Sequence, residues 1–557
     1  MITRTPSSSP VRPTRLLILL WIAFLFRGFW YCCLLPVWEG YDEPFHFAAL
    51  DNVAGGKGMP HAETPITLEV QDSLHLLPLP WELQFQQVPQ PLMVHDDFWR
   101  LSPNEQARRL NSIRQIPWQE GNQPATEPIL NYESQQAPLY YWLFGVPLRA
   151  IAAIPLLSRF FVMRLLGLLF SSLLVPIAYW IGKRVFRDTC LALGVVALLV
   201  LLPELMINLS RVSNETLAVV LYSLLLLFCL RIVDKPESWP NWTLAGLYLG
   251  LGLLTKAYFL TTVPAMAVVL ASALSSSRKH ADGKRYGIVL LRAAFTLLLP
   301  LLIAGRYYLH VHQATGSWSG QGDDVAMGHI PVSAKLAAIT HVNWKSGVLS
   351  VLISHIWFGG WSFLRVPTGI YVLAFLLVAL AFLGVLVRFW RASDPIFERR
   401  RVLVLAAFYA TFWAGVGYHV LVTFLNQGIS ASTGWYLYAA VGAELVLMAW
   451  GLQAFFSPRL VFGMLAVVLA ALDLYGTVTM LMPYYAGFTT HARGRVPPAF
   501  WSTISHLPTV FARLSYIRPA WLDAPVLVVI WLLYCIATAG SALIVFRLFR
   551  EENPQTD

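Results

Sequence analysis

The chain has 557 residues, of which 57% are hydrophobic and only 13% are charged, and its mean hydropathy is +0.58. This composition excludes a soluble globular domain and is typical of a polytopic membrane protein. The formal charge is +10, but the basic residues gather beside apolar segments, so nucleic acid is not indicated as a partner. The five cysteines have no CxxC spacing and indicate neither a disulfide framework nor a zinc site.

The first apolar segment, at about 16–36, follows a basic amino terminus and is predicted to span the membrane from the cytoplasmic side. No clear small-x-small cleavage site follows it, so we interpret it as a retained span rather than a signal peptide. The hydrophilic stretch 37–138 comes next and holds 14 of the 30 acidic residues against five basic ones. An acidic loop of this length is predicted on the outer face, with short interfacial helices.

The remaining apolar segments predict an all-α membrane protein of about 12 spans with both termini in the cytoplasm. The aromatic segment 139–155 is predicted to lie along the membrane interface, because a span here would put the basic residues at 183–187 outside. Segment 347–361 is short for a span and is interpreted as interfacial or re-entrant. The predicted spans lie at about 160–181, 190–207, 215–233, 244–274 as a two-armed hairpin, 288–304, 369–389, 402–424, 433–453, 460–482 and 525–547.

Acidic residues directly after the first span are the leading candidates for a function. An acid at a membrane boundary costs solvation energy unless it is wetted, paired or coordinated. Asp42 and Glu43 are adjacent, so on a helix they point about 100° apart, and His46 lies within one turn of both. Asp42 could act as a general base, or the three residues could bind a divalent metal ion. Alternatively, Asp42 and Glu43 lie in a solvated loop and simply begin a helix ahead of Pro44.

Two further acidic motifs come later in the chain. Glu133 precedes Pro138, which opens the aromatic segment containing Tyr140. Glu133 could face the same cavity as Asp42. Alternatively, it is an exposed acid in a loop, next to aromatic residues that lie at the membrane interface. Asp323-Asp324 follows a Gly- and Ser-rich turn and could bind an ion or a polar substrate, or be solvated in a loop.

Four cations lie within or beside apolar segments: Arg27, Arg164, Lys256 and Arg306. A cation in this position should have an anionic partner, which is either a protein carboxylate or a lipid phosphate. Lys256 is flanked by apolar residues on both sides, and snorkelling to the interface is its alternative. Arg306 lies at the exit of a span, and it could instead anchor the end of that span at the membrane interface.

The order of these features resembles the GT-C superfamily of membrane glycosyltransferases over about residues 10–310. It comprises a basic start, one span, an Asp-Glu pair at its outer end, a long acidic loop, an acid before Pro-Leu-Tyr-Tyr and a span that opens with arginine. The layout is similar to the branch of protein O-mannosyltransferases and aminoarabinose transferases and its uncharacterised bacterial relatives. The chain departs from that branch at Gln136-Ala137, where those relatives usually carry His-Pro or Lys-Pro.

The resemblance implies transfer of a sugar from a polyprenyl-phosphate donor to a glycan, lipid or protein acceptor, with inversion, at the outer (periplasmic) face of the inner membrane. It implies Asp42 as the catalytic base with Glu43 beside it, and Arg164 and Lys256 near the lipid phosphate. Arg306, Glu133 and Tyr140 are further candidates for contact with the substrate or the lipid phosphate. No cofactor is required on this interpretation, and a divalent ion held by His46 with the two acids stays open.

On this basis we expect five regions. They are a cytoplasmic tail at 1–15, a transmembrane catalytic core at 16–310 that includes the outer loop 37–138, an outer loop at 311–368, a variable transmembrane region at 369–548 and a cytoplasmic tail at 549–557. The outer segment 483–524 carries Arg493, Arg495, Arg513 and Arg518 against the charge rule. A proton- or cation-coupled secondary transporter and a non-catalytic scaffold are the rival interpretations, although the candidate groups do not lie at a bilayer midplane as a transporter would require.

Overall fold

The computed structural model describes residues 13–85, 92–116, 118, 128–277, 283–391, 396–491 and 497–549. These residues form helices and no strand, which confirms the all-α prediction, and two isolated bridges tie Pro65 to Leu130 and Leu79 to Val94. Most of the two predicted tails lies outside the described residues. The same holds for Arg278 and Lys279 in the predicted cytoplasmic turn, and for Arg493 and Arg495.

The first loop is built from short helices between α1 (Pro13–Leu34) and α7 (Leu156–Ser171). They are α2 (Glu43–Ala54), α3 (Leu68–Leu76), η1 (Trp81–Phe85), α4 (His95–Phe98), α5 (Pro103–Gln115), η2 (Tyr132–Gln135) and α6 (Leu139–Ala150). Helix α6 has 12 residues, which makes it about 18 Å long and too short to cross the hydrocarbon core. The aromatic segment is therefore not a span, and its position at the membrane interface stays a prediction.

The helices of the predicted spans, with the short elements that join or break them, follow in the order that the apolar segments predict. They are α8 (Leu174–Phe186), α9 (Thr189–Leu201), α10 (Pro203–Leu209), α11 (Glu215–Asp234), α12 (Trp239–Leu253), η3 (Ala257–Thr261), α13 (Thr262–Ser277), α14 (Gly283–Thr315), α18 (Thr368–Arg391), α19 (Ile396–Gln427), η5 (Gly434–Ala440), α20 (Val441–Leu452), α21 (Pro458–Tyr475) with the π-turn η6 (Gly476–Leu481), and α25 (Ala524–Leu548). Shorter helices lie between them: α15 (Gly322–Ala326), α16 (Val332–Ala338), α17 (Trp344–Ile356), α22 (Met482–Tyr485), α23 (Phe500–Ser505) and α24 (Leu507–Leu514).

Within the described residues, ten helical segments are long and apolar enough to cross a membrane, or eleven if the bent pair α9 and α10 is one span. The pair bends by 64°, because Pro203 opens α10 and Leu202 before it is extended. The chain is thus a multi-pass membrane protein. The predicted 12 spans counted both arms of the hairpin, and its first arm, α12, has only 15 residues. The hairpin itself is present, with its break at Leu254 to Lys256.

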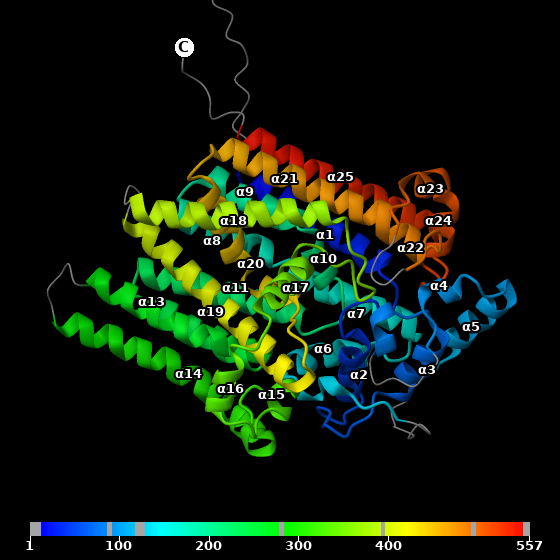
Figure 1. The fold of residues 1–557 in the computed structure, drawn as a ribbon, viewed down its shortest axis with the longest axis horizontal. Coiled ribbons are helices and arrows are strands. Elements are labelled where there is room, and N and C mark those ends of the chain that lie inside the picture. Colours follow the sequence, from blue (N-terminus) through cyan, green and yellow to red (C-terminus); the bar gives the residue numbers. More distant parts are fainter. Residues whose placement is uncertain are drawn as a thin grey trace, which may run out of the picture.

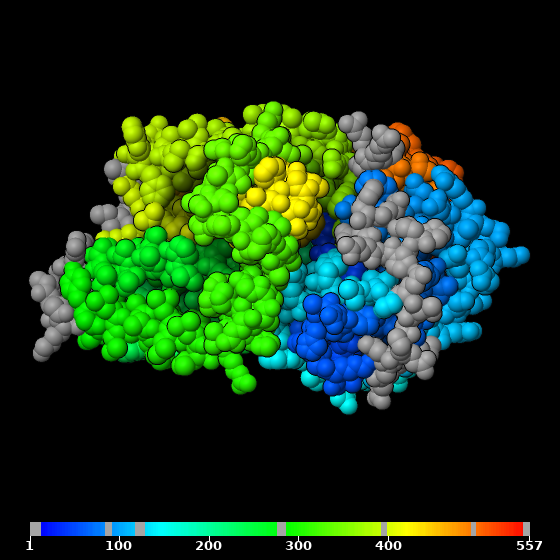
Figure 2. Space-filling view, turned by 60° about the horizontal axis from the view of Figure 1, so that its bottom comes forward, coloured from blue at the N-terminus to red at the C-terminus, as the bar shows by residue number. Residues whose placement is uncertain are grey.

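The helices are arranged so that distant parts of the chain meet at one end (Figure 1). Helices α21 and α25 lie side by side along one edge with α1 beside them, and α13 and α14 form the opposite edge. The first-loop helices and α22 to α24 share the same end of the molecule. Figure 2 shows part of this end, where first-loop residues lie beside the segments around α15 and α16 and beside the end of α19.

One buried polar network holds α1 against α21 and α25. Arg27 of α1 forms an ion pair with Asp473 of α21 at 2.8 Å, and both side chains are fully buried. The hydroxyls of Tyr31 and Tyr534 donate to the same carboxylate at 2.6 and 2.8 Å. Arg27 therefore has the anionic partner that its place in an apolar span requires.

Candidate active site

Asp42 stands where the chain turns from α1 into α2. Its φ is 58°, in the left-handed region, which aspartate tolerates better than most residues. Pro44 lies in the first turn of the helix, and the Asp42 carboxylate makes no cap bond to its own helix. Instead it accepts a hydrogen bond from the hydroxyl of Tyr132. The side chain is only partly buried, so it is fixed in place and still accessible.

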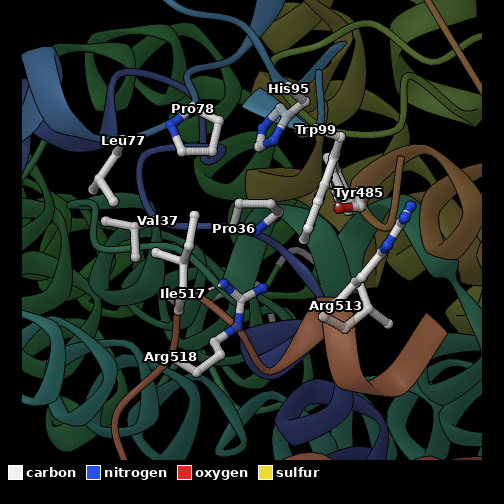
Figure 3. A pocket seen from close by; sticks show the side chains of 11 residues that line it. Pro36, Val37, Leu77, Pro78, His95, Trp99, Tyr485, Arg513, Ile517 and Arg518 are labelled. Atoms are coloured by element: carbon white, nitrogen blue, oxygen red, sulfur yellow. Dashed lines mark hydrogen bonds between the residues drawn. The ribbon is translucent and has the colours of Figure 1, made fainter. Parts of the chain in front are cut away.

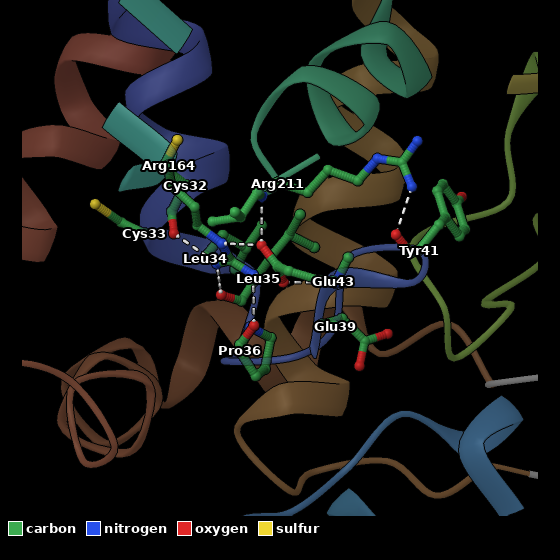
Figure 4. A network of polar contacts seen from close by, with 12 residues as sticks. Cys32, Cys33, Leu34, Leu35, Pro36, Glu39, Tyr41, Glu43, Arg164 and Arg211 are labelled. Atoms are coloured by element: carbon green, nitrogen blue, oxygen red, sulfur yellow. Dashed lines mark hydrogen bonds and ion pairs between the residues drawn. The ribbon is translucent and has the colours of Figure 1, made fainter. Parts of the chain in front are cut away.

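Glu43 points into a fully buried ion pair with Arg164 (Figure 4). Its Oε1 accepts from Arg164 Nε at 2.8 Å, and its Oε2 accepts from Arg164 Nη2 at 2.6 Å. The backbone N–H groups of Val212 and Gly40 also donate to this carboxylate, at 2.8 and 3.1 Å. The two neighbouring carboxylates therefore diverge, as expected from their adjacent positions, and Glu43 is fully engaged inside the protein.

The other N–H groups of Arg164 donate to three carbonyls at the end of α1, those of Cys32, Leu35 and Pro36. A guanidinium has five N–H donors, and all five are used within the protein. The predicted role of Arg164 beside a lipid phosphate does not fit this arrangement, because Glu43 is its anionic partner. The pair instead ties the end of α1 to α7 and to the start of α2.

Lys256 lies in the break between α12 and η3 and is 7% exposed. Its Nζ donates to Oε1 of Glu215, at the start of α11, and the Tyr258 hydroxyl donates to Oε2 at 3.1 Å. The ammonium also lies 5.1 Å from the centre of the Tyr436 ring, close enough for a cation–π interaction. The anionic partner of this lysine is thus a protein carboxylate.

Glu133 and His46 meet behind Asp42. Oε2 of Glu133 lies 3.8 Å from Nδ1 of His46, and Nδ1 is 2.7 Å from the Tyr141 hydroxyl. Glu133 is 5% exposed, and its Oε2 has no hydrogen-bond partner. The structure therefore brings Glu133 to the Asp42 region, as the sequence suggested, with one carboxylate oxygen unsatisfied.

Burial sets the protonation of these acids. It raises the pKa of Glu133 to about 8, helped by the negative charge of Asp42. It raises the pKa of Glu82 to about 7, again with Asp42 contributing. Burial also raises the pKa of Asp42, although the Tyr132 hydrogen bond and the cations Arg211 and Lys256 oppose the rise. At neutral pH, Glu133 is therefore mainly protonated.

Arg211 is a central cation that the sequence patterns did not single out. It is 1% exposed and donates to the Tyr41 carbonyl at 2.5 Å and to Oδ1 of Asn208 at 2.7 Å. The Tyr41 ring stacks on Trp435 at 3.7 Å, which brings η5 against the start of α2. The polar run from 208 to 216 between two apolar segments is the signal that could have indicated this site; it supplies Arg211 and also Glu215.

Two other buried acids hold the segment after α17 against the first loop. Glu204 accepts from the Tyr41 hydroxyl at 2.5 Å and from the N–H groups of Phe358 and Gly359 at 2.8 and 3.1 Å. Glu39 accepts from the Ser362 N–H at 2.7 Å. Segments that are more than 150 residues apart in the sequence thus form one wall of the site.

Two of the predicted contact residues lie differently from expectation. Tyr140 is buried, and its ring stacks on Phe144 at 4.7 Å within α6. Arg306 is exposed on α14 and forms no ion pair with any described residue. The tyrosines that follow it turn inward instead, and the hydroxyl of Tyr307 donates to the Gln135 carbonyl at 3.3 Å.

The predicted metal ligands do not come together. Glu43 bonds Arg164, Asp42 accepts from Tyr132, and His46 lies beside Tyr141. Among the described residues, no group of three His, Cys, Asp or Glu side chains is placed to hold a metal ion. The physical reason is that each of the three has a different partner from a distant part of the chain.

Asp323 and Asp324 are neither free in solvent nor placed at Asp42. Asp323 accepts from Thr423, Asn426 and Gln427 of α19 at 2.6 to 3.0 Å. Although burial opposes the effect, these hydrogen bonds lower the pKa of Asp323. The pair therefore fastens the loop after α14 to α19.

The fold is that of an all-helical multi-pass membrane protein, and among its described residues Asp42 is a partly exposed carboxylate beside a buried polar cluster. Residues 24–434 match the family model described as "Predicted membrane protein (DUF2142)", and the chain belongs to that family. No curated protein shows a significant sequence match to it.

Solved structures match the chain at low sequence identity. ArnT from Cupriavidus metallidurans bound to undecaprenyl phosphate is 16% identical, with a TM-score of 0.37, over 74% of this chain and 68% of that one. The oligosaccharyltransferase AglB from Archaeoglobus fulgidus, in complex with an inhibitory peptide and a dolichol-phosphate, is 14% identical, with a TM-score of 0.41, over 95% of this chain and 56% of that one.

Proposed function

We propose that the protein is an integral membrane glycosyltransferase that moves a sugar from a polyprenyl-phosphate donor to an acceptor hydroxyl at the outer face of the inner membrane. The proposal is carried by one observation. Asp42 is partly exposed and oriented by Tyr132, whereas Glu43, Glu133 and Glu215 around it are buried. A carboxylate that is both fixed and accessible is suited to general-base work.

In this reaction Asp42 takes the proton of the acceptor hydroxyl while the oxygen attacks the anomeric carbon. The bond from that carbon to the phosphate oxygen breaks on the opposite face, so the configuration inverts. Burial raises the pKa of Asp42, which strengthens it as a base, and the Tyr132 hydrogen bond keeps one oxygen in a fixed direction. The lipid phosphate leaves with the electron pair of the broken bond.

The departing phosphate needs positive charge, which Lys256 and Arg211 supply in this proposal. Both are close enough to Asp42 to affect its pKa. Glu215 neutralises Lys256 in the present structure, so a phosphate would have to share this ammonium. Because Glu133 is mainly protonated at neutral pH, it adds little repulsion toward a phosphate. Cations in a dry site stabilise a developing anion more than they would in water.

An apolar cavity of about 490 Å³ gives the donor chain a lateral route. It lies between α1, α6 and α7 and is lined mainly by Trp21, Phe144, Pro147, Leu169 and Phe170. Helix α6 packs on α2, which begins beside Asp42. We assign the cavity to the polyprenyl chain, with the sugar end near α2.

The proposed reaction uses no nucleotide, and its roles are all filled by side chains; the effect of a chelator on transfer tests whether a divalent ion also takes part. We also propose that the amino and carboxyl ends lie in the cytoplasm, which cysteine labelling at each end would check. Either result on the metal leaves the role of Asp42 to be judged by its own variant.

The deciding experiment measures transfer of radiolabelled sugar from a panel of polyprenyl-phosphate sugars by membranes with matched protein levels. Asp42→Asn should lower transfer by about 10²- to 10⁴-fold, the usual contribution of a general base. Asp72→Asn, an exposed acid of the same loop, is the matched control and should retain transfer. Equal transfer by the Asp42 variant and the wild type would exclude this base.

An ion-coupled transporter is the second candidate, and one observation favours it. The helix break between α9 and α10 places Glu204 at the start of a half-helix, a feature of transporter ion sites. Against it, both oxygens of Glu204 are already bonded by Tyr41 and by backbone N–H groups. Substrate uptake into proteoliposomes driven by a proton or cation gradient, without sugar transfer, would favour the transporter.

A further inference from the structure

A histidine and a glutamate join the carboxyl end of α17 to α20. Nε2 of His355 lies 2.7 Å from Oε1 of Glu444. Nδ1 of the same ring lies 3.1 Å from the carbonyl oxygen of Gly434, where η5 begins. His355 is 9% exposed, so both ring nitrogens have their partners inside the protein.

These two contacts determine how many protons the pair holds. A backbone carbonyl can only accept a hydrogen bond, so Nδ1 of His355 carries a proton. The contact between Nε2 and the carboxylate has hydrogen-bond length and needs a second proton, which sits either on the imidazole or on the carboxyl group. Without it, the lone pairs of Nε2 and of Oε1 face each other at 2.7 Å, and the contact becomes repulsive.

The charges around the imidazole favour the second proton. Burial lowers the pKa of His355, but the charge and the hydrogen bond of Glu444 outweigh it, so the pKa is raised above its ordinary value of 6.5. Glu204 of α10 also faces the ring and adds to the rise. Tyr409 of α19 and Tyr438 of η5 lie near Glu444. In the described part of the chain Glu444 bonds no group other than His355, and its Oε2 is buried without a partner.

The pair of His95 and Glu39 in the first loop is less dependent on its histidine. Nε2 of His95 lies 3.3 Å from Oε2 of Glu39, and the N–H and the hydroxyl of Ser362 donate to the same carboxylate. His95 also lines a cavity of about 20 Å³ beside Arg518 (Figure 3), which has room for about one water molecule. Glu39 therefore keeps partners without its histidine, whereas Glu444 does not.

The position of η5 depends on the end of α17. The Gly434 N–H donates to Oγ of Ser354 at 2.7 Å, and the Tyr438 hydroxyl donates to the His355 carbonyl at 2.6 Å. A Cβ on Gly434 would lie 2.0 Å from the carbonyl oxygen of Val351, so a glycine is needed where the two backbones meet. A change at the His355 ring therefore acts directly on the start of η5.

Element η5 carries two aromatic residues of the candidate active site. The Trp435 ring stacks on Tyr41 at 3.7 Å, and the centre of the Tyr436 ring lies 5.1 Å from Nζ of Lys256. A shift of η5 thus moves both rings relative to the start of α2 and to the buried lysine.

We propose that His355 is a positioning residue, and that the proton it shares with Glu444 holds η5 in place, so that loss of this proton at alkaline pH loosens η5. The proposal goes beyond sugar transfer and does not rest on it, because its test reads the exchange of backbone N–H groups and not a product. The pKa of His355 is raised from 6.5. The stability that the proton gives is therefore complete below about pH 6.5 and is lost as the pH rises through the raised pKa.

The experiment measures hydrogen exchange of residues 434–440 in the purified full chain in detergent, corrected for the pH dependence of intrinsic exchange. Between about pH 6 and 10, the protection of this segment in the wild type should fall by up to about tenfold per pH unit, the slope for one proton. His341→Gln, a change at an exposed histidine, should keep this fall. Glu133→Gln should also keep it, which separates His355 from the titration of Glu133.

The deciding variant is Glu444→Gln. A glutamine amide can donate an N–H to Nε2 of a neutral imidazole while Nδ1 still bonds Gly434, so the contact no longer needs the second proton. Protection of residues 434–440 should then be independent of pH, whereas a merely structural role would lower it equally at every pH and leave the alkaline fall. His355→Gln gives the same test from the other side, because its amide can donate to the Glu444 carboxylate at any pH. Constant protection in the wild type, or an unchanged alkaline fall in either glutamine variant, overturns the proposal.

Discussion

The buried polar clusters around Asp473 and around Asp42 are built from the same kinds of residue, yet they differ in how completely their acids are satisfied. Both oxygens of Asp473 are bonded, by Arg27 and by two tyrosine hydroxyls, and the side chain is fully buried. Asp42 is partly exposed, and Glu133 behind it has an oxygen without a partner. A carboxylate with both oxygens bonded helps to fix a structure, whereas a carboxylate with an unbonded oxygen can still accept a hydrogen bond from a ligand.

The largest effect on stability should come from breaking the buried network around Asp473. Asp473→Asn leaves the Arg27 charge buried without its carboxylate, which should lower the free energy of unfolding by about 3–5 kcal/mol. Asp97→Asn removes an exposed pair with Arg100 at 3.5 Å and should cost under about 1 kcal/mol. Thermal unfolding in detergent compares the two.

A double variant sharpens this prediction. Arg27→Met with Asp473→Leu removes both charges and should recover most of the lost stability. If the single Asp473→Asn variant unfolds at the wild-type temperature, the network is not a structural tie. Asp42→Asn, by contrast, should unfold close to the wild type while losing transfer.

Much of this architecture follows from local sequence. Apolar length indicates the long helices, and the break at Thr255-Lys256 indicates the hairpin between α12 and α13. The prediction of about 12 spans compares with ten or eleven candidate spans among the described residues, and α12 accounts for a difference because it has 15 residues and packs against α11 and α14. A composition window does not show which helices are covered by others.

The site was predicted less completely, for a physical reason. The place of Asp42 depends on local features, a span end and a helix start, and these are visible in the sequence. The partner of Arg164 is Glu43, which is 121 positions away, and that of Arg27 is Asp473. Such long-range pairs are set by helix packing, so charge rules require a partner without naming it.

The cluster around Asp42 should make both stability and donor binding depend on pH, through the titration of Glu133. Its pKa is raised from 4.5 to about 8, so the stability that protonation gives is complete below about pH 4.5 and is lost as the pH rises through 8. Above that pH a second negative charge appears beside Asp42 and repels a phosphate-linked donor. The KM for the donor should therefore rise on the alkaline side.

Glu133→Gln should remove this alkaline rise, because glutamine stays neutral at every pH. Glu63→Gln, in an exposed part of the same loop, should keep the wild-type profile. The measurement is the KM of sugar transfer between about pH 6 and 9, a range that covers the raised pKa. An unchanged alkaline rise in Glu133→Gln would show that another group causes it.

The smallest effect should come from removing one hydrogen bond to Asp42. Tyr132→Phe deletes the hydroxyl that donates to this carboxylate, and a bond to a charged group is worth about 1.5–3 kcal/mol at most sites. Because Tyr132 is 37% exposed, water replaces part of that bond, and we expect a loss of kcat of about tenfold, or 1.4 kcal/mol. The hydrogen bond lowers the pKa of Asp42, so the acid limb of the pH–rate profile should move to higher pH.

The chain contains a matched control for this change. The Tyr418 hydroxyl donates to Oδ1 of Asp324 at 2.5 Å, so Tyr418→Phe removes the same kind of bond outside the candidate site. It should leave both kcat and the acid limb unchanged. A shift of the acid limb in Tyr132→Phe alone would show that the tyrosine acts through the base, because a general loss of stability lowers the rate without moving that limb. Equal pH–rate profiles for the two variants would mean that Tyr132 does not tune the pKa of Asp42. The contrast between the carboxylates of Asp42 and Asp473 would then rest on their accessibility alone.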